Sequence, residues 1–194
     1  MKNRTKFFAL SLLSLCMLTA VVCAKEGSSA KAGQQAANTV VVSYDLHKIP
    51  VYATNQWAIW VEDSSGKFIR TLFATRFTAK GGYIKRTSSL KTWVEKSFWK
   101  DASAEEIDAL SSATPSAGGQ SVTWDCTDKK GNKVPDGKYT ICMEGNLRQG
   151  KMMYAKAIVS VGGKSQKITA DLNFVPEEGK SEPLFENVTV EYIK

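Results

Sequence analysis

The chain has 194 residues, of which 43% are hydrophobic and 23% are charged, and its formal net charge at pH 7 is +7. This length suits one domain with a sizeable core. The basic residues are scattered and do not form a stripe interleaved with aromatic residues, which excludes the usual pattern of a nucleic-acid-binding surface.

The first 24 residues have the pattern of a secretory signal peptide. Basic residues precede the apolar run FFALSLLSLCMLTAVV, and the residues around Ala24 predict cleavage after it. A lipoprotein attached through Cys23 is the alternative, although Val22 is large for the position before a lipidated cysteine. No later apolar run is long enough to span a bilayer. The processed chain is therefore expected in the periplasm or outside the cell, without a transmembrane segment.

The processed chain is expected to begin with a tether and to continue as one domain. Residues 25–38 (KEGSSAKAGQQAAN) are small, polar and aperiodic, which is typical of a flexible segment. Beyond residue 24 the chain has 23 basic and 19 acidic residues, a net charge of +4. Residues 39–194 are expected to form the single domain.

Strand patterns dominate this domain. Many short segments are rich in β-branched and aromatic residues or alternate between apolar and polar residues, with turn-forming residues between them. They are VVVSY (40–44), QWAIWVED (56–63), KFIRTLF (67–73), SVTWD (121–125), KYTICME (138–144), YAKAIVSV (154–161), KITADLNF (167–174) and VTVEY (188–192). This pattern predicts an all-β sandwich or barrel.

One region, about 90–110, has helical spacing instead. Its apolar residues are Leu90, Trp93, Val94, Phe98, Ile107 and Leu110. Ser103 and Glu106 form a plausible capping box for a second short helix. Residues 76–118 are therefore predicted to be a helical or irregular insertion, and a connection this long is usually functional or mobile.

The tryptophans indicate what the insertion covers. Trp57 and Trp60 lie on opposite faces of one predicted strand, so only one of them can point into a single core. Cover for the other is expected from the insertion, with Trp93 and Phe98. The alternative is an exposed aromatic groove for a glycan, a peptide or a flat cofactor ring.

The segment WDCTDKKGNKVPDGKYT (124–140) resembles the immunoglobulin-like domain of flagellar hook-capping proteins. Aromatic residues are expected to pack on the sandwich face, while acids and glycines satisfy turns. The structural residues are Trp124, Asp125, Asp128, Gly131, Gly137 and Tyr139. Cys126 stands where the family usually has glycine. The resemblance implies an Ig-like or fibronectin-like antiparallel β-sandwich.

The exported domain as a whole resembles a family of predicted periplasmic proteins of unknown function. The shared segments are WAIWVEDSSGKFIRTL (57–72), DALSSATPSAGG (108–119) and the Trp-Asp segment above, in that order. The family implies an Ig-like fold outside the cytoplasm, sometimes encoded near membrane flavin and electron-transfer proteins, and no agreed catalytic residues. The leading hypothesis is thus a non-catalytic binding or accessory module with a protein partner in the cell envelope, associated with such a flavin system.

Few residues suit catalysis or metal binding. His47 is the only histidine and lies in a polar break after the first strand. Asp125, Asp128 and Gly131 do not have the spacing of a calcium loop. No catalytic residue, resident cofactor or metal site is therefore assigned.

Cys126 and Cys142 remain after the leader, and an oxidising compartment permits a disulfide between them. A hairpin turning at Gly131-Asn132 would place the two on opposite faces, too far apart to be bridged. A broad loop over 127–137 would instead bring them level. Both arrangements stay open.

The stretch DALSSATPS (108–116) carries the alternative function. It resembles the Asp-x-x-Ser/Thr-Gly-Ala-Thr segment at which exported flavoproteins are esterified to FMN. Asp108, Ser111 and Thr114 match, with Thr114 as the attachment residue, while Ser112 replaces the glycine. The resemblance implies a covalent FMN carrier, and the competing interpretation is an ordinary polar loop after a short helix.

Overall fold

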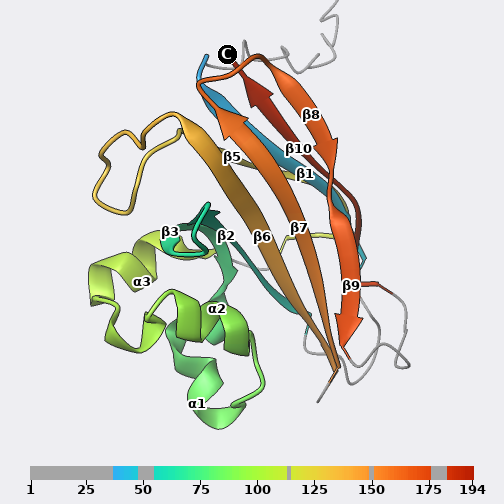
Figure 1. Cartoon of the computed structure of the whole chain (residues 1–194). Coiled ribbons are helices and arrows are strands. Elements are labelled where there is room, and N and C mark those ends of the chain that lie inside the picture. The colour runs from blue at the N-terminus through green and yellow to red at the C-terminus, as the bar shows by residue number, and fades with distance from the viewer. Residues whose placement is uncertain (1–36, 48–54, 113–114, 149–150, 176–182) are drawn as a thin grey trace, which may run out of the picture. The chain divides into compact units, whose positions relative to one another are not determined.

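The computed structural model describes residues 37–47, 55–112, 115–148, 151–175 and 183–194. The predicted leader, its cleavage at Ala24, the Cys23 alternative and most of the tether lie outside these residues. The described residues form two β-sheets that pack face to face, with short helices beside the larger sheet (Figure 1). The prediction of an all-β sandwich is confirmed.

The smaller sheet, sheet A, has the strand order β5-β1-β10-β8. Its strands are β1 (Thr39–Leu46), β5 (Gly118–Trp124), β8 (Gln166–Thr169) and β10 (Phe185–Ile193). The larger sheet, sheet B, has the order β4-β3-β2-β6-β7-β9. Its strands are β2 (Gln56–Asp63), β3 (Phe68–Thr75), β4 (Ser111–Ser112), β6 (Gly137–Arg148), β7 (Lys151–Val161) and β9 (Asp171–Val175). The described ladders are antiparallel except for the short β3–β4 pair.

The inner core lies between the two sheets and is built from alternate residues of their strands. Val188, Val190 and Tyr192 of β10 are at most 1% exposed, as their period-two spacing predicts. Trp57 of β2 enters the same core and stacks on Phe73 with 5.2 Å between ring centroids. Burial of these large side chains supplies most of the driving force for sheet packing.

Residues 167–174, predicted as one strand, are two strands in different sheets. β8 pairs with β10 in sheet A, whereas β9 pairs with β7 in sheet B. Between them, the amide of Ala170 donates a hydrogen bond to the carbonyl of Val188 at 2.9 Å. The apolar alternation continues through this crossing because both halves face the same core, so it did not reveal the change of sheet.

The Trp-Asp segment also differs from the predicted hairpin. β5 belongs to sheet A and β6 to sheet B, so the loop between them crosses from one layer to the other. Trp124 and Tyr139 nevertheless meet edge to face across the interface, with centroids 5.3 Å apart. The open question of a Cys126–Cys142 disulfide is resolved against it: both thiols are free, Cys126 packing in the inner core and Cys142 in a cluster on the outer face of sheet B.

The predicted insertion is present and covers part of the outer face of sheet B (Figure 1). Its helical elements are η1 (Thr78–Gly82), α1 (Tyr83–Lys85), α2 (Lys91–Lys96), η2 (Trp99–Asp101) and α3 (Ala104–Leu110). The Ser103 hydroxyl accepts a hydrogen bond from the Glu106 amide at 3.2 Å, which confirms the predicted cap of α3.

The outer cluster that this insertion forms is rich in tryptophan. Trp60 of β2 packs there with Trp93 of α2 and Trp99 of η2, so Trp57 and Trp60 do face opposite sides of sheet B. The expectation for Phe98 was wrong, because Phe98 is 73% exposed and Trp99 takes the buried place.

Candidate functional site

A groove lies on the outer face of sheet B, beside helix α2. Cross-strand register places Trp60 opposite Cys142, Cys142 opposite Lys156, and Lys156 opposite Asp171. Side chains opposite one another on antiparallel strands share a face, so these strands form a continuous floor. The groove has a volume of about 490 Å³. It is lined by Trp60, Glu62, Thr92, Lys96, Tyr154, Lys156, Asp171, Asn173 and Val175.

A buried carboxylate lies under the wall of this groove. Glu144 of β6 is 0% exposed. Its Oε2 accepts a hydrogen bond from the Trp93 amide at 2.7 Å and its Oε1 accepts one from the Thr92 amide at 3.2 Å. These amides belong to the first turn of α2, where helical N–H groups have no partner within the helix. Glu144 therefore fixes the start of α2 against the sheet.

Burial and hydrogen bonding act in opposite directions on the acidity of Glu144. Burial raises the pKa of this carboxyl to about 7, while the hydrogen bonds from Trp93 and Thr92 act to lower it. The Tyr154 hydroxyl donates to Glu144 Oε1 at 3.4 Å and is 3.1 Å from Thr92 Oγ1. The buried carboxylate is thus connected to the groove surface through Tyr154.

The two sides of the groove differ in how their charges are compensated. On one side, Glu62 Oε1 accepts a hydrogen bond from Trp60 Nε1 at 2.9 Å and lies 3.3 Å from Lys96 Nζ. On the other side, Lys156 and Asp171 are exposed and form no ion pair with each other or with another described residue. The second side therefore offers a cation and an anion to a ligand.

The groove has no activated nucleophile among its described residues. Cys142 lies beneath the floor, and burial, followed by the nearby Glu62 charge, raises the pKa of its thiol to about 12. His47 is not part of the groove; its Nε2 is 2.9 Å from Glu186 Oε1. Among the described residues, no group of three or more potential ligands could hold a metal ion. The arrangement suits binding through hydrogen bonds and charge.

The residues predicted for flavin attachment lie elsewhere, at the end of α3. Asp108 forms an ion pair with Lys80 at 2.7 Å, and the hydrogen bond from Lys80 lowers the pKa of Asp108. Ser111 pairs with Ala74 in the β3–β4 ladder. Thr114 lies outside the described residues, so the attachment position itself stays a prediction.

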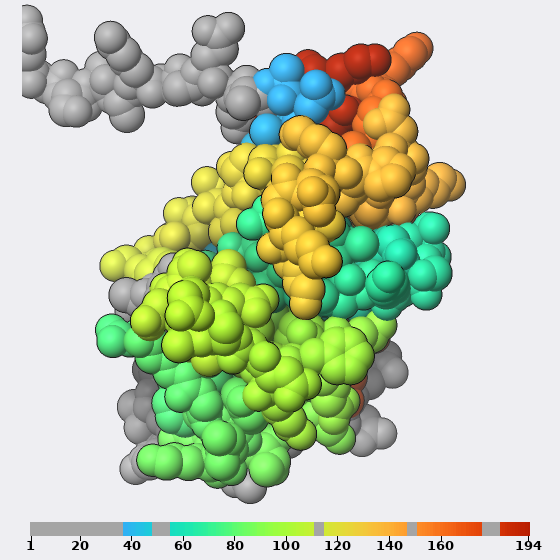
Figure 2. All heavy atoms as spheres, turned by 90° about the vertical axis from the view of Figure 1, so that its left-hand side faces the viewer, coloured from blue at the N-terminus to red at the C-terminus, as the bar shows by residue number. Residues whose placement is uncertain are grey.

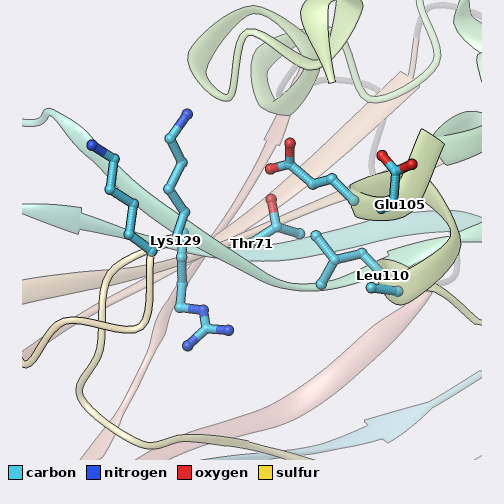
Figure 3. Close-up of a pocket in the computed structure, with 8 residues that line it drawn as sticks. Thr71, Glu105, Leu110 and Lys129 are labelled. Carbon is cyan, nitrogen blue, oxygen red and sulfur yellow. The ribbon is translucent and has the colours of Figure 1, made fainter. Parts of the chain in front are cut away.

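The end of α3 borders a separate cleft of about 450 Å³. Figure 3 shows Lys129 on one side of this cleft, Glu105 and Leu110 on the other, and Thr71 of β3 between them. Arg70 and Lys130 also line it. The sequence resemblance thus pointed to a segment beside a real cleft, but not to the groove over β9.

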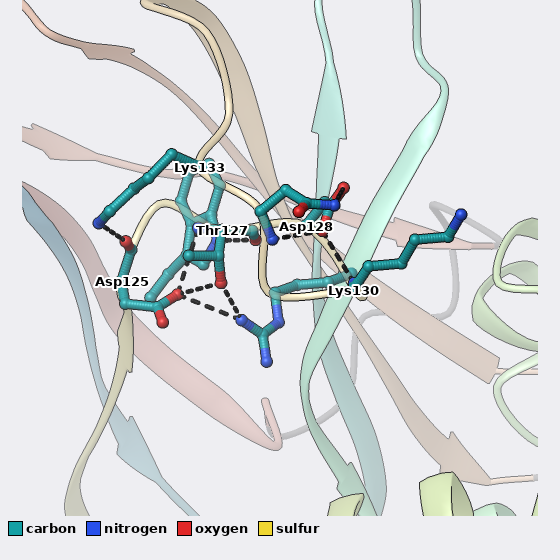
Figure 4. Close-up of polar contacts among 8 residues, drawn as sticks. Asp125, Thr127, Asp128, Lys130 and Lys133 are labelled. Carbon is teal, nitrogen blue, oxygen red and sulfur yellow. Dashed lines mark hydrogen bonds and ion pairs between the residues drawn. The ribbon is translucent and has the colours of Figure 1, made fainter.

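The acids of the Trp-Asp segment organise its loop (Figure 4). Asp125 Oδ1 accepts hydrogen bonds from the Thr127 amide at 3.2 Å and the Thr127 hydroxyl at 2.6 Å. Asp128 Oδ1 accepts from the amides of Lys130 and Asn132 at 2.8 and 2.9 Å. Both acids therefore stabilise turns, as their sequence positions predict.

Two positions in this loop carry positive φ angles. Gly131 has φ 81°, as predicted for a turn glycine. Cys126 stands at the position where the hook-capping pattern has glycine. Its φ is 56°, so it adopts the left-handed backbone despite its side chain. Gly137 was expected to serve a turn, but it begins β6 and its φ is not positive. Its role in a turn geometry was therefore predicted wrongly.

Sequence reasoning missed most of the groove. Glu144 was the available signal, because an acid inside the apolar strand ICMEG has to find buried partners. Tyr154, Lys156 and Asp171 look like ordinary outward-facing strand residues. Only strand pairing shows that they share one surface with α2.

The fold and groove define a class: a two-layer antiparallel β-sandwich with a helical cover on one sheet and a polar groove beside that cover. Over residues 29–173 the chain matches the family described as "Predicted periplasmic protein (DUF2271)", and it belongs to that family. The matched span includes every groove residue except Val175.

No curated protein and no solved structure matches the chain. Within the described residues, the helices are too short or too polar to cross a membrane.

Proposed function

We propose that this chain is a non-catalytic, exported binding module that holds an extended segment of a cell-envelope protein along β9. The observation that carries the proposal is the position of β9. This strand ends the described order of sheet B and also lines the groove. An edge strand presents unpaired N–H and C=O groups, and an added peptide strand uses them for affinity.

The groove supplies the means of selecting a partner. Val175 of β9 is 47% exposed and offers an apolar contact. Lys156 and Asp171 offer opposite charges, and Asn173 offers an amide. A peptide strand paired with β9 places alternate side chains over these groups. The preferred segment carries at least one acidic and one basic residue.

The state of the nucleophiles supports a non-catalytic role. Burial raises the pKa of the Cys126 thiol to about 11 and that of the Cys142 thiol to about 12. A thiol is an effective nucleophile only as the thiolate, so both cysteines are inert at neutral pH. The single histidine lies outside the groove.

The Ig-like character of the sandwich is part of the same proposal. The Tyr139 hydroxyl donates a hydrogen bond to the carbonyl of Pro135 at 2.7 Å, four residues earlier. This contact resembles the tyrosine corner of Ig domains. It supports the likeness to the Ig-like domain of hook-capping proteins.

Site-specific photocrosslinking in the periplasm tests the binding site. A photoreactive amino acid replaces Asn173 of β9 and, as the matched control, Thr169 of β8; both are exposed positions on neighbouring edge strands of different sheets. We expect a discrete protein adduct from position 173 that is absent at 169 and weakened by Asp171→Lys. Adducts of equal yield at both positions, or none at 173, would rule out the groove as the binding site.

The covalent FMN carrier is a second proposal, with its own supporting observation. Ala109 and Leu110 of α3 line a cleft that also contains Arg70, Lys129 and Lys130, and cations of this kind suit a flavin phosphate. The test is the intact mass of protein exported in cells that contain the flavin transferase, with Thr114→Ala as control. An unmodified mass and no yellow colour exclude the carrier without affecting the groove proposal.

A further inference from the structure

Phe98 combines a strained backbone with an exposed aromatic side chain. It lies between α2 and η2 with φ 54° and ψ 37°, in the left-handed region. That region favours glycine, because a β-carbon crowds the backbone there. The Phe98 side chain is 73% exposed, whereas the neighbouring Trp99 is buried and donates to the Ala79 carbonyl at 2.9 Å. Among the described residues, the Phe98 ring makes no ring-stacking or cation–π contact that would explain an aromatic side chain at this position.

Lysines surround this side chain. Phe98 borders a hollow of about 400 Å³ together with Lys67, Lys129 and Lys130. Lys100 lies two residues further along the chain and is exposed, whereas Lys96 is paired with Glu62. We give the name Phe98 patch to the following residues: Phe98, Lys67, Lys100, Lys129 and Lys130. Figure 2 shows the loop that carries Lys129 and Lys130, in yellow-orange, lying against the green helical insertion.

Nearby acids offset only part of the charge of the patch. Asp128 also lines the hollow as a carboxylate held by the Lys130 and Asn132 amides. The four lysines of the patch form no ion pair with a described residue. Residues 76–101 contain seven basic and two acidic residues, and all seven basic side chains are exposed. The rest of the chain beyond residue 24 contains 16 basic and 17 acidic residues. The positive charge of the processed chain is therefore concentrated in residues 76–101, the part of the insertion that precedes α3.

We propose that the Phe98 patch docks on an anionic phospholipid surface. An aromatic side chain that protrudes among lysines can enter the interface while the ammonium groups meet lipid phosphates. The patch uses lysines, which are point charges on flexible stems, and these suit many laterally mobile headgroups. A structured acidic partner is more often bound by the planar, bidentate arginine side chain. This surface is separate from the groove along β9.

Vesicle flotation tests the docking surface. The probe is the full chain after export, recovered from the soluble periplasmic fraction, mixed with phosphatidylcholine vesicles with or without about 30% phosphatidylglycerol. We expect binding roughly tenfold or more tighter to the anionic vesicles, and its loss in about 0.5 M salt, because salt screens exposed charges.

Two variants locate the binding surface. Phe98→Gly is expected to weaken vesicle binding roughly tenfold. The same variant is expected to raise the urea midpoint of unfolding, because glycine relieves the left-handed strain. A fold-damaging substitution cannot produce this combination. Lys129→Glu/Lys130→Glu is expected to abolish binding, whereas Lys164→Glu/Lys167→Glu, which makes the same charge change on exposed lysines near and within β8, retains it.

The following outcomes overturn the proposal. One is equal binding to neutral and anionic vesicles, or no binding to either. Another is an equal loss in the two charge-reversal variants, which indicates net charge alone. A third is unchanged binding by Phe98→Gly together with equally tight binding of soluble polyglutamate, which indicates an acidic polymer and not a membrane.

Discussion

Both faces of sheet B pack against other elements, but the two contacts are built in different ways. The inner face meets sheet A through aliphatic and aromatic side chains that alternate along the strands. The outer face meets the helical insertion through tryptophans whose N–H groups all have acceptors. Trp60 donates to Glu62, Trp93 to the Thr71 hydroxyl, and Trp99 to a backbone carbonyl.

The outer face also buries a carboxyl group and several small polar side chains. Thr75 donates to Gln56 at 2.6 Å, and the hydroxyls of Thr78 and Ser89 lie 2.8 Å apart. Glu144 is fully buried on this side. Apolar contacts tolerate small shifts, whereas buried polar groups are costly when a partner is lost. The inner face should therefore determine global stability, and the outer face should hold the insertion through specific contacts.

The largest effect is expected from the inner face. Trp57→Ala removes a fully buried ring that stacks on Phe73 and donates to the Tyr44 hydroxyl. Truncation of a core aromatic residue should lower the free energy of unfolding by about 3–5 kcal/mol. Urea unfolding followed by circular dichroism measures it, with Ile158→Ala at an exposed position as control. A loss no larger than the control's would contradict the assigned core.

A smaller and local effect is expected from the outer face. Glu144→Leu leaves the amides of Thr92 and Trp93 without their acceptor, which should cost about 2–4 kcal/mol. Hydrogen exchange should show lost protection in residues 78–101, while β1 and β10 stay protected. If protection fell uniformly, the insertion and the sandwich would open together, and the insertion would not be a separate unit.

The pH dependence of stability sharpens the same contrast. The pKa of Glu144 is raised from 4.5 to about 7, so between these values the folded chain binds more protons than the unfolded chain. Stability from this group is therefore present below pH 4.5 and is lost as pH rises to about 7, by roughly 2–3 kcal/mol. The lowered pKa values of Asp63, Asp125 and Asp128 act at lower pH, below 3.8.

Glu144→Gln provides the control for this dependence. The variant has no proton to bind at residue 144, so its unfolding free energy should vary less between pH 4.5 and 7 than that of the parent chain. Urea midpoints at several pH values give the comparison. Parallel curves for the two proteins would show that another group controls the dependence.

A small effect on the inner side is expected at Cys126. Cys126→Ala keeps a β-carbon at φ 56° and loses the buried sulfur, and it should cost about 1 kcal/mol. Cys126→Gly loses the same sulfur but relieves the left-handed strain, so it should be more stable than Cys126→Ala. The ranking of their urea midpoints checks this. The reverse ranking would mean that residue 126 does not adopt the left-handed conformation.

The last prediction concerns the reactivity of the two cysteine thiols and involves no change in stability. Because Cys126 and Cys142 are buried on opposite faces of sheet B, the native chain should react slowly with a chromogenic disulfide reagent, and the denatured exported chain should show both thiols. A denatured chain with neither thiol would indicate a disulfide.

The sequence predicted local features well where one physical rule decides them. Alternation identified the buried rows of β10, and it separated Trp57 from Trp60. Ser103 and Glu106 located the start of α3. Phe98 was misplaced because a left-handed turn follows α2 and shifts the buried position to Trp99. A helical period cannot anticipate such a turn.

The sequence by itself determined which side chains turn toward a core, because the period of two along a strand is a property of the backbone and needs no partner. Only the tertiary structure decided which sheet each strand joined, including the crossings at Ala170 and between β5 and β6. The groove also depends on the tertiary structure. Its rows join Trp60, Cys142, Lys156 and Asp171, which are distant in sequence and become neighbours only through strand register.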